Sequence, residues 1–325
     1  MSDLLPVLSY AVFFLVFASI FATMALGLNL QWGFTGLFNV GVAGFVAVGA
    51  YASALLTTPP DMGAGAVRTV GWGFPIVVGW IGGTAAAGLV ATLVGFAALR
   101  LRHDYLAIAT FGVAVVIQLV ALNAQKLTGG PFGIQFVPKP FDAELDGSLA
   151  FNALYLAIVL GVLGTVYVAM QRLTASPWGR VLRAIREDET AAEAAGKRAF
   201  VFRLQSFAIG GAIMGLGGAL YAHFVGYIAP EDFLPILTFQ LWTMLIVGGA
   251  GNNRGAVLGA VVVWFVWTIA GNGLRELVPP AEQARAAALQ IVLVGVLLAA
   301  MLVWRPHGLI GEPLADPKRP RGKTP

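Results

Sequence analysis

Long apolar stretches separated by short polar segments dominate this sequence. An α-helix needs about 20 residues to cross roughly 30 Å of hydrocarbon. Only 11% of the 325 residues are charged and 58% are hydrophobic, whereas about a quarter of the residues in soluble domains are charged. The sequence therefore predicts an all-α, polytopic membrane protein. About nine spans are expected, with eight to ten possible, at 7–29, 34–56, 74–99, 105–123, 151–171, 203–227, 234–250, 255–274 and 286–304.

We expect residues 1–305 to form a single transmembrane domain and residues 306–325 to be a disordered cytoplasmic tail. Loops 100–104, 172–203 and 251–254, together with the tail after Trp304, hold fifteen of the twenty Lys and Arg residues. Basic loops are retained on the cytoplasmic side of a membrane. With nine spans, this pattern puts the N-terminus outside and the C-terminus inside.

The segment from Asn29 to Tyr51 is rich in glycine and amide side chains and is unfavourable for a straight helix. Unwound backbone at membrane depth is tolerated where it is packed in protein or lines a wet cavity. Residues 30–45 are thus either a broken segment beside a transport path or a tight connection followed by close helix packing. Residues 234–250 are either a short span or a re-entrant half-helix. The candidate path residues are Asn29, Gly33, Gly36, Asn39 and Gly41.

The segment from Gln171 to Arg203 is the longest strongly charged run between two apolar spans. It contains seven basic and four acidic residues. We interpret its core, the loop 172–202, as a cytoplasmic contact site for a motor subunit. The alternative is a solvated helical hairpin.

Two short helices are predicted within this loop. Ser176-Pro177 is typical of a helix start, with Ser as N-cap and Pro at the first helical position. Arg180 and Arg183 then fall three residues apart on one face. A second helix is expected to start at Asp188 and to end before Gly196, which suits a C′ position.

Several kinds of chemistry are missing from the sequence. The centres of the predicted spans contain no Asp, Glu, Lys or Arg, residues that usually mark proton or ion pathways. The chain has no cysteine, its three histidines are widely separated, and no glycine-rich run ends in Lys-Ser/Thr. We therefore predict no metal site, no catalytic residues and no ATP site. A transporter of this kind must receive its energy from another subunit, unless it is a secondary carrier working alone.

Several runs of the sequence together resemble one transporter family. They include GLNLQWGFTGLFNVGVAGFVAVGAY, LRLRHDYLAIATFGVAVVIQLVALNAQKLTGGPFGI, SPWGRVLRAIREDETAAEAAGKRAFVFR and LIVGGAGNNRGAVLGA. From about residue 25 to 305 the chain is similar to the permease subunit of branched-chain amino acid ABC importers of the LivM type.

This resemblance implies an importer of the bacterial inner membrane. Its partners would be a second homologous permease, two cytoplasmic ATPases that use ATP and Mg²⁺, and a periplasmic binding protein. This chain would bind no cofactor and no nucleic acid. Glu193, Ala194, Ala195 and Gly196 match the motif that docks on the ATPase. The implied cargo is branched-chain amino acids, with urea, short amides or other amino acids as alternatives.

Overall fold

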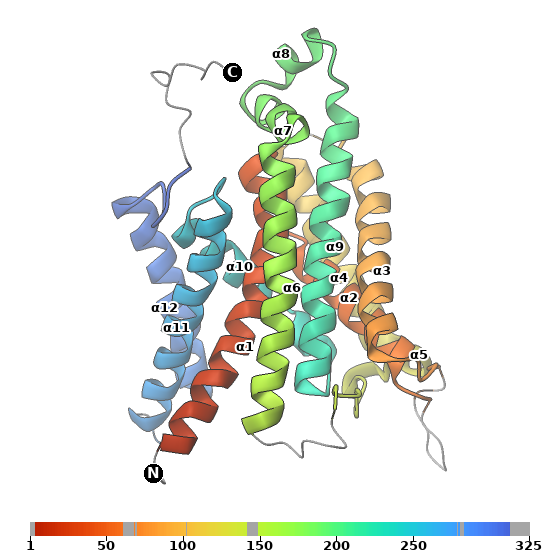
Figure 1. The fold of residues 1–325 in the computed structure, drawn as a ribbon, viewed down its shortest axis with the longest axis vertical. Coiled ribbons are helices and arrows are strands. Elements are labelled where there is room, and N and C mark those ends of the chain that lie inside the picture. Colours follow the sequence, from red (N-terminus) through yellow and green to blue (C-terminus); the bar gives the residue numbers. More distant parts are fainter. Residues whose placement is uncertain are drawn as a thin grey trace, which may run out of the picture.

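The chain forms a bundle of helices, most of which run along one axis (Figure 1). The computed structural model describes residues 4–60, 68, 70–101, 103–141, 149–277, 279 and 283–312. Within these ranges there is no strand, only an isolated antiparallel bridge between Ile134 and Ile228.

The elements are α1 (Leu4–Asn29), η1 (Leu30–Phe34), α2 (Val42–Thr57), α3 (Ile76–Ala98), α4 (His103–Asn123), α5 (Gln125–Thr128), η2 (Gly130–Phe132), α6 (Leu149–Ala175), α7 (Pro177–Glu187), α8 (Glu189–Ala194), α9 (Ala199–Val225), η3 (Pro230–Phe233), α10 (Pro235–Gly248), α11 (Asn253–Leu277) and α12 (Gln283–Trp304).

The all-helical, polytopic class predicted from the sequence is confirmed. Among the described residues, six helices are long and apolar enough to cross a membrane. Three shorter apolar helices, α2, α10 and α12, accompany them. The predicted spans lie close to these helices, except for the second.

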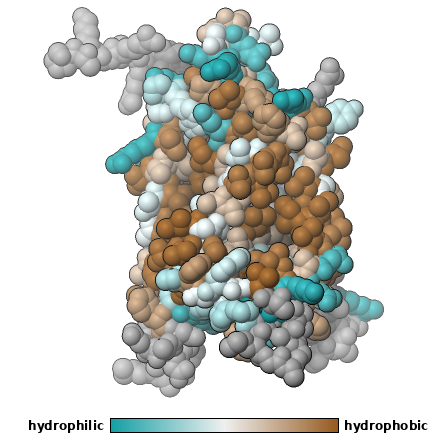
Figure 2. All heavy atoms as spheres, turned by 90° about the vertical axis from the view of Figure 1, so that its right-hand side faces the viewer, coloured by the Kyte–Doolittle hydropathy of each residue, from teal (hydrophilic) through white to brown (hydrophobic). Residues whose placement is uncertain are grey.

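The surface of the bundle is apolar around its middle. In Figure 2 a hydrophobic band separates two more polar ends. Helix α3 shows how this band arises, because its large side chains point outward, with Ile81 66%, Leu89 61% and Leu93 64% exposed. Its buried positions hold only glycine and alanine. Small residues inside and large apolar residues outside suit a helix whose outer face meets lipid.

Helix α9 is central and packs against α1, α2 and α3. Gly215 of α9 permits the closest of these approaches. A Cβ placed there would lie 2.1 Å from the Ala87 Cβ of α3 and 3.5 Å from the Gly49 Cα of α2. No side chain larger than hydrogen fits at this crossing, so Gly215 serves close helix packing, for which small residues are common in membrane interiors.

The first α-helix ends at Asn29, the predicted end of the first span, and a break follows, as one of the two interpretations of residues 30–45 predicts. After Asn29 it continues for five residues as a π-helix, η1, and the chain then runs without regular structure from residue 35 to 41. The predicted second span, 34–56, is wrong at its start, because α2 begins only at Val42. The glycine and amide side chains of this region indicated a break, whereas its apolar residues led to a predicted span that starts too early. Since a π-turn and irregular backbone free carbonyl and amide groups, the break needs partners from elsewhere in the fold.

The start of the predicted disordered tail is ordered. Residues 305–312 turn back onto the bundle, with Leu309 N donating to Val247 O (2.8 Å) and Ile310 N to Gly248 O (3.0 Å). The prediction was wrong for 306–312 because these residues pair with backbone groups at the end of α10. The rest of the predicted tail, 313–325, lies outside the described residues.

Replacing Gly215 with Val should destabilise the protein by roughly 1–3 kcal/mol, because overpacking forces neighbours apart. The same change at Gly164 on α6 is the matched control, since a Cβ there meets nothing within 4 Å. Thermal unfolding in detergent measures both effects. Equal midpoints for the two variants would contradict the packing described for α9.

Candidate coupling site at one end of the bundle

Helices α7 and α8 form a small hairpin at one end of the bundle, the same end at which α12 finishes (Figure 1). The intervening loop is shorter than the predicted 172–202, because α6 continues to Ala175 and α9 begins at Ala199. The two short helices predicted in this loop are both present.

Helix α7 begins at Pro177, as predicted from Ser176-Pro177. The predicted role of the Ser176 side chain as a cap is wrong, because its hydroxyl donates to Leu173 O (2.7 Å) at the end of α6 instead. The inner face of α7 buries Leu182 and Ile185. These apolar contacts fix the hairpin against the bundle.

Helix α8 carries caps at both ends. The Asp188 side chain accepts a hydrogen bond from Ala191 N (3.0 Å). At the other end Lys197 N donates to Ala192 O (3.1 Å) and Gly196 N to Glu193 O (2.8 Å), the two bonds of a Schellman motif. Gly196 has a φ of +80°, as its predicted C′ position requires.

Residues Glu193, Ala194, Ala195 and Gly196 form one exposed turn. A Cβ added at Gly196 would meet nothing within 4 Å. Within this chain, the backbone conformation is therefore the reason for a glycine here, and lack of space for a side chain is not. The turn leaves a compact, uncovered surface of small residues beside one carboxylate, and its role in docking on an ATPase stays a prediction.

Arg186 joins the hairpin to the rest of the chain. Its guanidinium donates to the Gly33 carbonyl at the helix break. It also pairs with Glu312 of the C-terminal segment (2.9 Å) and with its neighbour Glu187 (2.7 Å). The side chain is only 22% exposed. A single side chain of α7 therefore holds three parts of the chain that are far apart in sequence.

The two arginines predicted to share a face of α7 have different surroundings. Arg183 is half-buried, and its guanidinium carbon lies 6.0 Å from the centre of the Phe34 ring, within the range of a cation–π interaction. It also lines a cavity of about 280 Å³ together with Asn252 and Asn253. Arg180 is exposed. Arg183 thus faces the bundle, whereas Arg180 faces outward.

A second ion pair fixes the base of the hairpin. Arg203, near the start of α9 and only 9% exposed, donates to both carboxylate oxygens of Glu189 at 2.8 and 3.0 Å. Both contacts come from the Nη1 nitrogen, and a hydrogen bond between two charged groups is stronger than one between neutral groups. The hairpin is therefore tied to α9 as well as to the helix break.

Buried amide side chains lie directly beneath the hairpin. Asn29 donates to the Asn253 side chain (3.0 Å) and accepts from Gly251 N (2.9 Å). Asn253 in turn donates to the Gln171 side chain (2.8 Å). These bonds connect the end of α1 to the turn before α11 and to α6. Buried polar groups with partners on several elements fix one arrangement of those elements.

A related group of bonds holds the segment of the break itself. Gln31 donates to Phe207 O (2.8 Å), and Asn39 donates to the Gln31 side chain (2.7 Å). The carbonyl of Asn39 accepts from the Trp242 indole (3.0 Å). Gly41 N, just before α2, donates to the Asn39 side chain (2.8 Å). The irregular backbone is packed in protein, as membrane depth requires.

The five candidate path residues thus form one continuous region. Asn29 and Asn39 are fully buried with internal partners. Gly33 binds Arg186, Gly36 lies against the Arg186 side chain, and Gly41 precedes α2. The break and the hairpin, which the sequence suggests as separate sites, are in contact. Whether these residues also line a transport path stays a prediction.

The residues that sequence reasoning missed are those that join the two sites. Arg186 lies three residues after Arg183 and six after Arg180, a spacing that could have marked it as part of the same basic series. Its partners Gly33 and Glu312 are 153 and 126 residues away in sequence. No local pattern in the sequence predicts contacts between residues so far apart.

Comparison with known proteins assigns this architecture to a family. Residues 10–302 match the family described as branched-chain amino acid transport system / permease component. The chain belongs to this family. The match includes at least most of every long helix described here, together with the hairpin and the helix break.

Named relatives of this permease agree with the assignment. It is 32% identical to the high-affinity branched-chain amino acid transport system permease protein LivM of Salmonella typhimurium, over 92% of this chain and 69% of the relative. It is 30% identical to a probable LivM of Methanocaldococcus jannaschii, over 93% and 94% of the two chains. It is 28% identical to the guanosine ABC transporter permease NupQ of Bacillus subtilis, over 71% and 76%. No solved structure matches the chain.

The contacts of Arg186 in this permease can be measured by a double-mutant cycle. Arg186→Gln and Glu312→Gln should each lower stability, and the cycle should give a coupling energy of about 0.5–1 kcal/mol, as expected for a partly exposed ion pair. Arg186→Gln should be the more costly single change because it also loses the Gly33 carbonyl. Thermal unfolding is the measurement and Arg180→Gln, at an exposed position, is the control. An additive cycle would contradict the Arg186–Glu312 contact.

Proposed function

We propose that this chain is a permease subunit of an ATP-driven, binding-protein-dependent importer of branched-chain amino acids in a bacterial inner membrane. It would form the translocation path with a second, homologous permease. Two cytoplasmic ATPases, using ATP and Mg²⁺, would supply the energy, and a periplasmic binding protein would deliver the cargo. The permease itself would perform no hydrolysis.

The observation that supports this proposal best is the contact between the hairpin and the helix break. The turn Glu193–Gly196 is exposed and provides a surface to which another protein can bind. Arg186 and Arg203 tie the same hairpin to α1, α9 and the C-terminal segment. A surface that is open on one side and rigidly joined to the core on the other suits the transmission of force.

Coupling would then proceed as follows. Closure of the ATPases on ATP displaces the α7–α8 hairpin as a rigid body. Arg186 transmits this displacement to the Gly33 carbonyl, at the point where α1 is already irregular and its backbone can bend. The bundle switches between inward-facing and outward-facing states, since a packed interface moves between discrete arrangements. Only a partner that binds the two states with different affinity can drive the change.

We further infer nine crossings, with the N-terminus outside and the C-terminus inside. Helix α1 begins at the end of the bundle opposite to that at which α12 finishes (Figure 1), which fits an odd number of crossings. The hairpin, with its many arginines, would then be cytoplasmic, in line with the positive-inside rule. The loop that carries Glu231 and Asp232 would face the periplasm.

This orientation can be tested with single cysteines, because the chain has none of its own. A membrane-impermeant thiol reagent added outside intact spheroplasts should label Glu231→Cys, whereas Glu193→Cys should react only after the membrane is opened. Phe265→Cys, at an apolar position that is 54% exposed on α11, should react poorly in both cases. Labelling of Glu193→Cys from outside would overturn the orientation.

The identity of the cargo is inferred from the names of the relatives. The two LivM proteins are named for branched-chain amino acids and the more distant NupQ for guanosine, so guanosine transport is the competing assignment. Uptake of L-leucine and of guanosine by the reconstituted importer, with its own binding protein, distinguishes them.

Charge reversal by Glu193→Lys should reduce ATP-dependent leucine uptake to background while the protein remains in the membrane. The reason is that this carboxylate lies in the exposed turn proposed to dock on the ATPase. Replacing Gly196 with a bulky residue should have the same effect, because the φ of +80° disfavours any side chain and the turn would lose its shape. Uptake into proteoliposomes and ATP hydrolysis stimulated by the loaded binding protein are the two readouts.

Glu193→Gln is the conservative control and should lose less uptake than Glu193→Lys. Unchanged stimulation of ATP hydrolysis in Glu193→Lys would exclude the turn as the coupling element. Uptake by the chain alone, without ATPase subunits, would establish a secondary carrier instead.

A further inference from the structure

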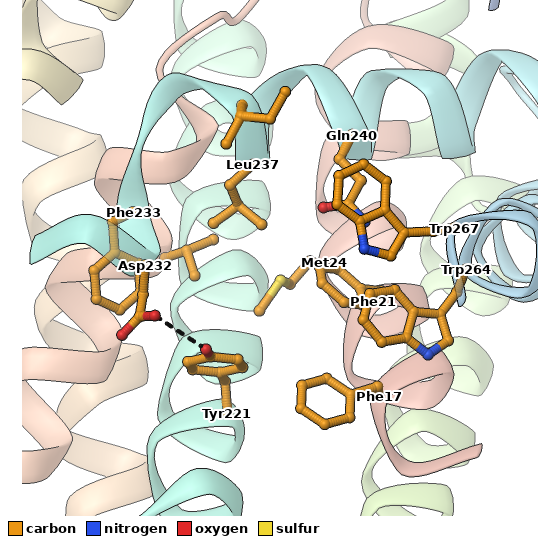
Figure 3. A pocket seen from close by; sticks show the side chains of 12 residues that line it. Phe17, Phe21, Met24, Tyr221, Asp232, Phe233, Leu237, Gln240, Trp264 and Trp267 are labelled. Carbon is orange, nitrogen blue, oxygen red and sulfur yellow. Dashed lines mark hydrogen bonds between the residues drawn. The ribbon is translucent and has the colours of Figure 1, made fainter. Parts of the chain in front are cut away.

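A pocket lies between α1, α2, α9, η3, α10 and α11 (Figure 3). Its volume is about 200 Å³, far above the roughly 10–15 Å³ that a single water requires. Most of its wall is apolar and aromatic, with Phe17 and Phe21 from α1 and Trp264 and Trp267 from α11. Such a wall favours a branched or aromatic hydrocarbon group over water.

Two polar groups in this pocket lack partners. Gln240 of α10 is only 7% exposed, and its Nε2 makes no hydrogen bond among the described residues. The indole nitrogen of Trp264 is likewise buried without an acceptor there. Buried donors are nearly always paired, and an exception calls for an explanation. A ligand that brings its own acceptor, such as a carboxylate, would supply the missing partner.

A carboxylate stands on the other side of the same pocket. Asp232 in η3 is half-buried and accepts from Ala229 N (2.8 Å) and from the Tyr221 hydroxyl (3.4 Å). No ion pair of Asp232 is found with any other described residue. Burial raises the pKa of Asp232 above the usual range for aspartate. A cationic group in the pocket would relieve this cost, because opposite charge favours the ionised form.

We propose that this pocket holds a hydrophobic amino acid during transport, with its carboxylate on the Gln240 amide, its side chain among the aromatic rings and its ammonium group facing Asp232. This inference rests on the proposed function, since it names a binding site for the cargo of the importer. Figure 3 shows the arrangement: Asp232 and Tyr221 lie on one side, Gln240 and the two tryptophans on the other, and Met24 and Phe21 between them.

Thiol labelling tests occupancy of the pocket directly. Ile236 lines the pocket and is 36% exposed, and a cysteine there would be the only one in this subunit. In the assembled permease–ATPase complex in nanodiscs, without binding protein, L-leucine should slow labelling of Ile236→Cys by a small methanethiosulfonate. L-Glutamate should not. Glu231→Cys, at an exposed position of η3 outside the pocket, is the control whose labelling leucine should leave unchanged.

Gln240→Leu tests the proposed carboxylate contact. Loss of a charge-assisted hydrogen bond should raise the leucine concentration that protects Ile236→Cys by roughly tenfold to a hundredfold. The same change should maintain or raise Tm, because it removes a buried amide without a partner. Normal protection by leucine in Gln240→Leu would overturn the assigned contact.

Asp232 and Glu231 carry neighbouring carboxyl groups, so Asp232→Asn and Glu231→Gln are matched substitutions. Only Asp232→Asn should weaken protection by leucine, because only Asp232 lines the pocket. Equal effects of the two substitutions would overturn the role of Asp232.

The pocket and the importer function can fail separately. If the wild-type importer takes up leucine but leucine does not protect Ile236→Cys, the pocket is not a cargo site and the importer function stands. If leucine protects but the wild-type importer does not take it up, the pocket stands and the proposed function falls. If leucine neither protects Ile236→Cys nor is taken up, both the cargo site and the importer function are overturned.

Discussion

The structure depends on how the broken first helix satisfies its backbone inside an apolar bundle. Water and lipid cannot supply hydrogen bonds at this depth, so each freed group must bond within the protein or remain at a cost. The Asn39 side chain accepts from Gly41 N, and the Trp242 indole of α10 donates to the Asn39 carbonyl. Gln31 ties the segment to the Phe207 carbonyl of α9. Arg186 completes the set from outside the bundle by binding the Gly33 carbonyl. The fold and the proposed function therefore both depend on Arg186, since this residue helps to stabilise the break and also belongs to the hairpin.

The double role of Arg186 explains why the hairpin suits the proposed role of moving the bundle. A solvated hairpin would be held by its own caps and by a few apolar contacts. Here Leu182 and Ile185 are buried and Arg203 pairs with Glu189, so that displacement of α7 must disturb α9 and the break together. The C-terminal segment adds a further link through Glu312. The pocket beside Gln240 is formed by α1, α2, α9, η3, α10 and α11. Of these helices, α9 is also bonded to Gln31 of the break and to Glu189 of the hairpin.

Much of the fold could be predicted from the sequence, because hydrophobic length and helix-end chemistry are local signals. Pro177, Asp188 and Gly196 mark the two short helices correctly for this reason. A break in residues 30–45 was one of two interpretations of the sequence, because glycine and amide side chains are local signals too. The start of the second span was misplaced because the partners that hold the break, Phe207 for Gln31 and Trp242 for Asn39, are distant in sequence. Arg186 and Glu312 were missed because their contact joins residues 126 positions apart. The pocket was missed for the same reason, since six separate elements build it.

The central claim is that Arg186 carries the movement of the hairpin into the helix break. The most direct measurement is the number of ATP molecules hydrolysed per leucine imported, in proteoliposomes that contain the complete importer. The account predicts that this ratio rises in Arg186→Gln and stays at the wild-type value in Arg180→Gln, because only the first change cuts the link to Gly33. An unchanged ratio in Arg186→Gln, in a correctly folded complex, would contradict the account.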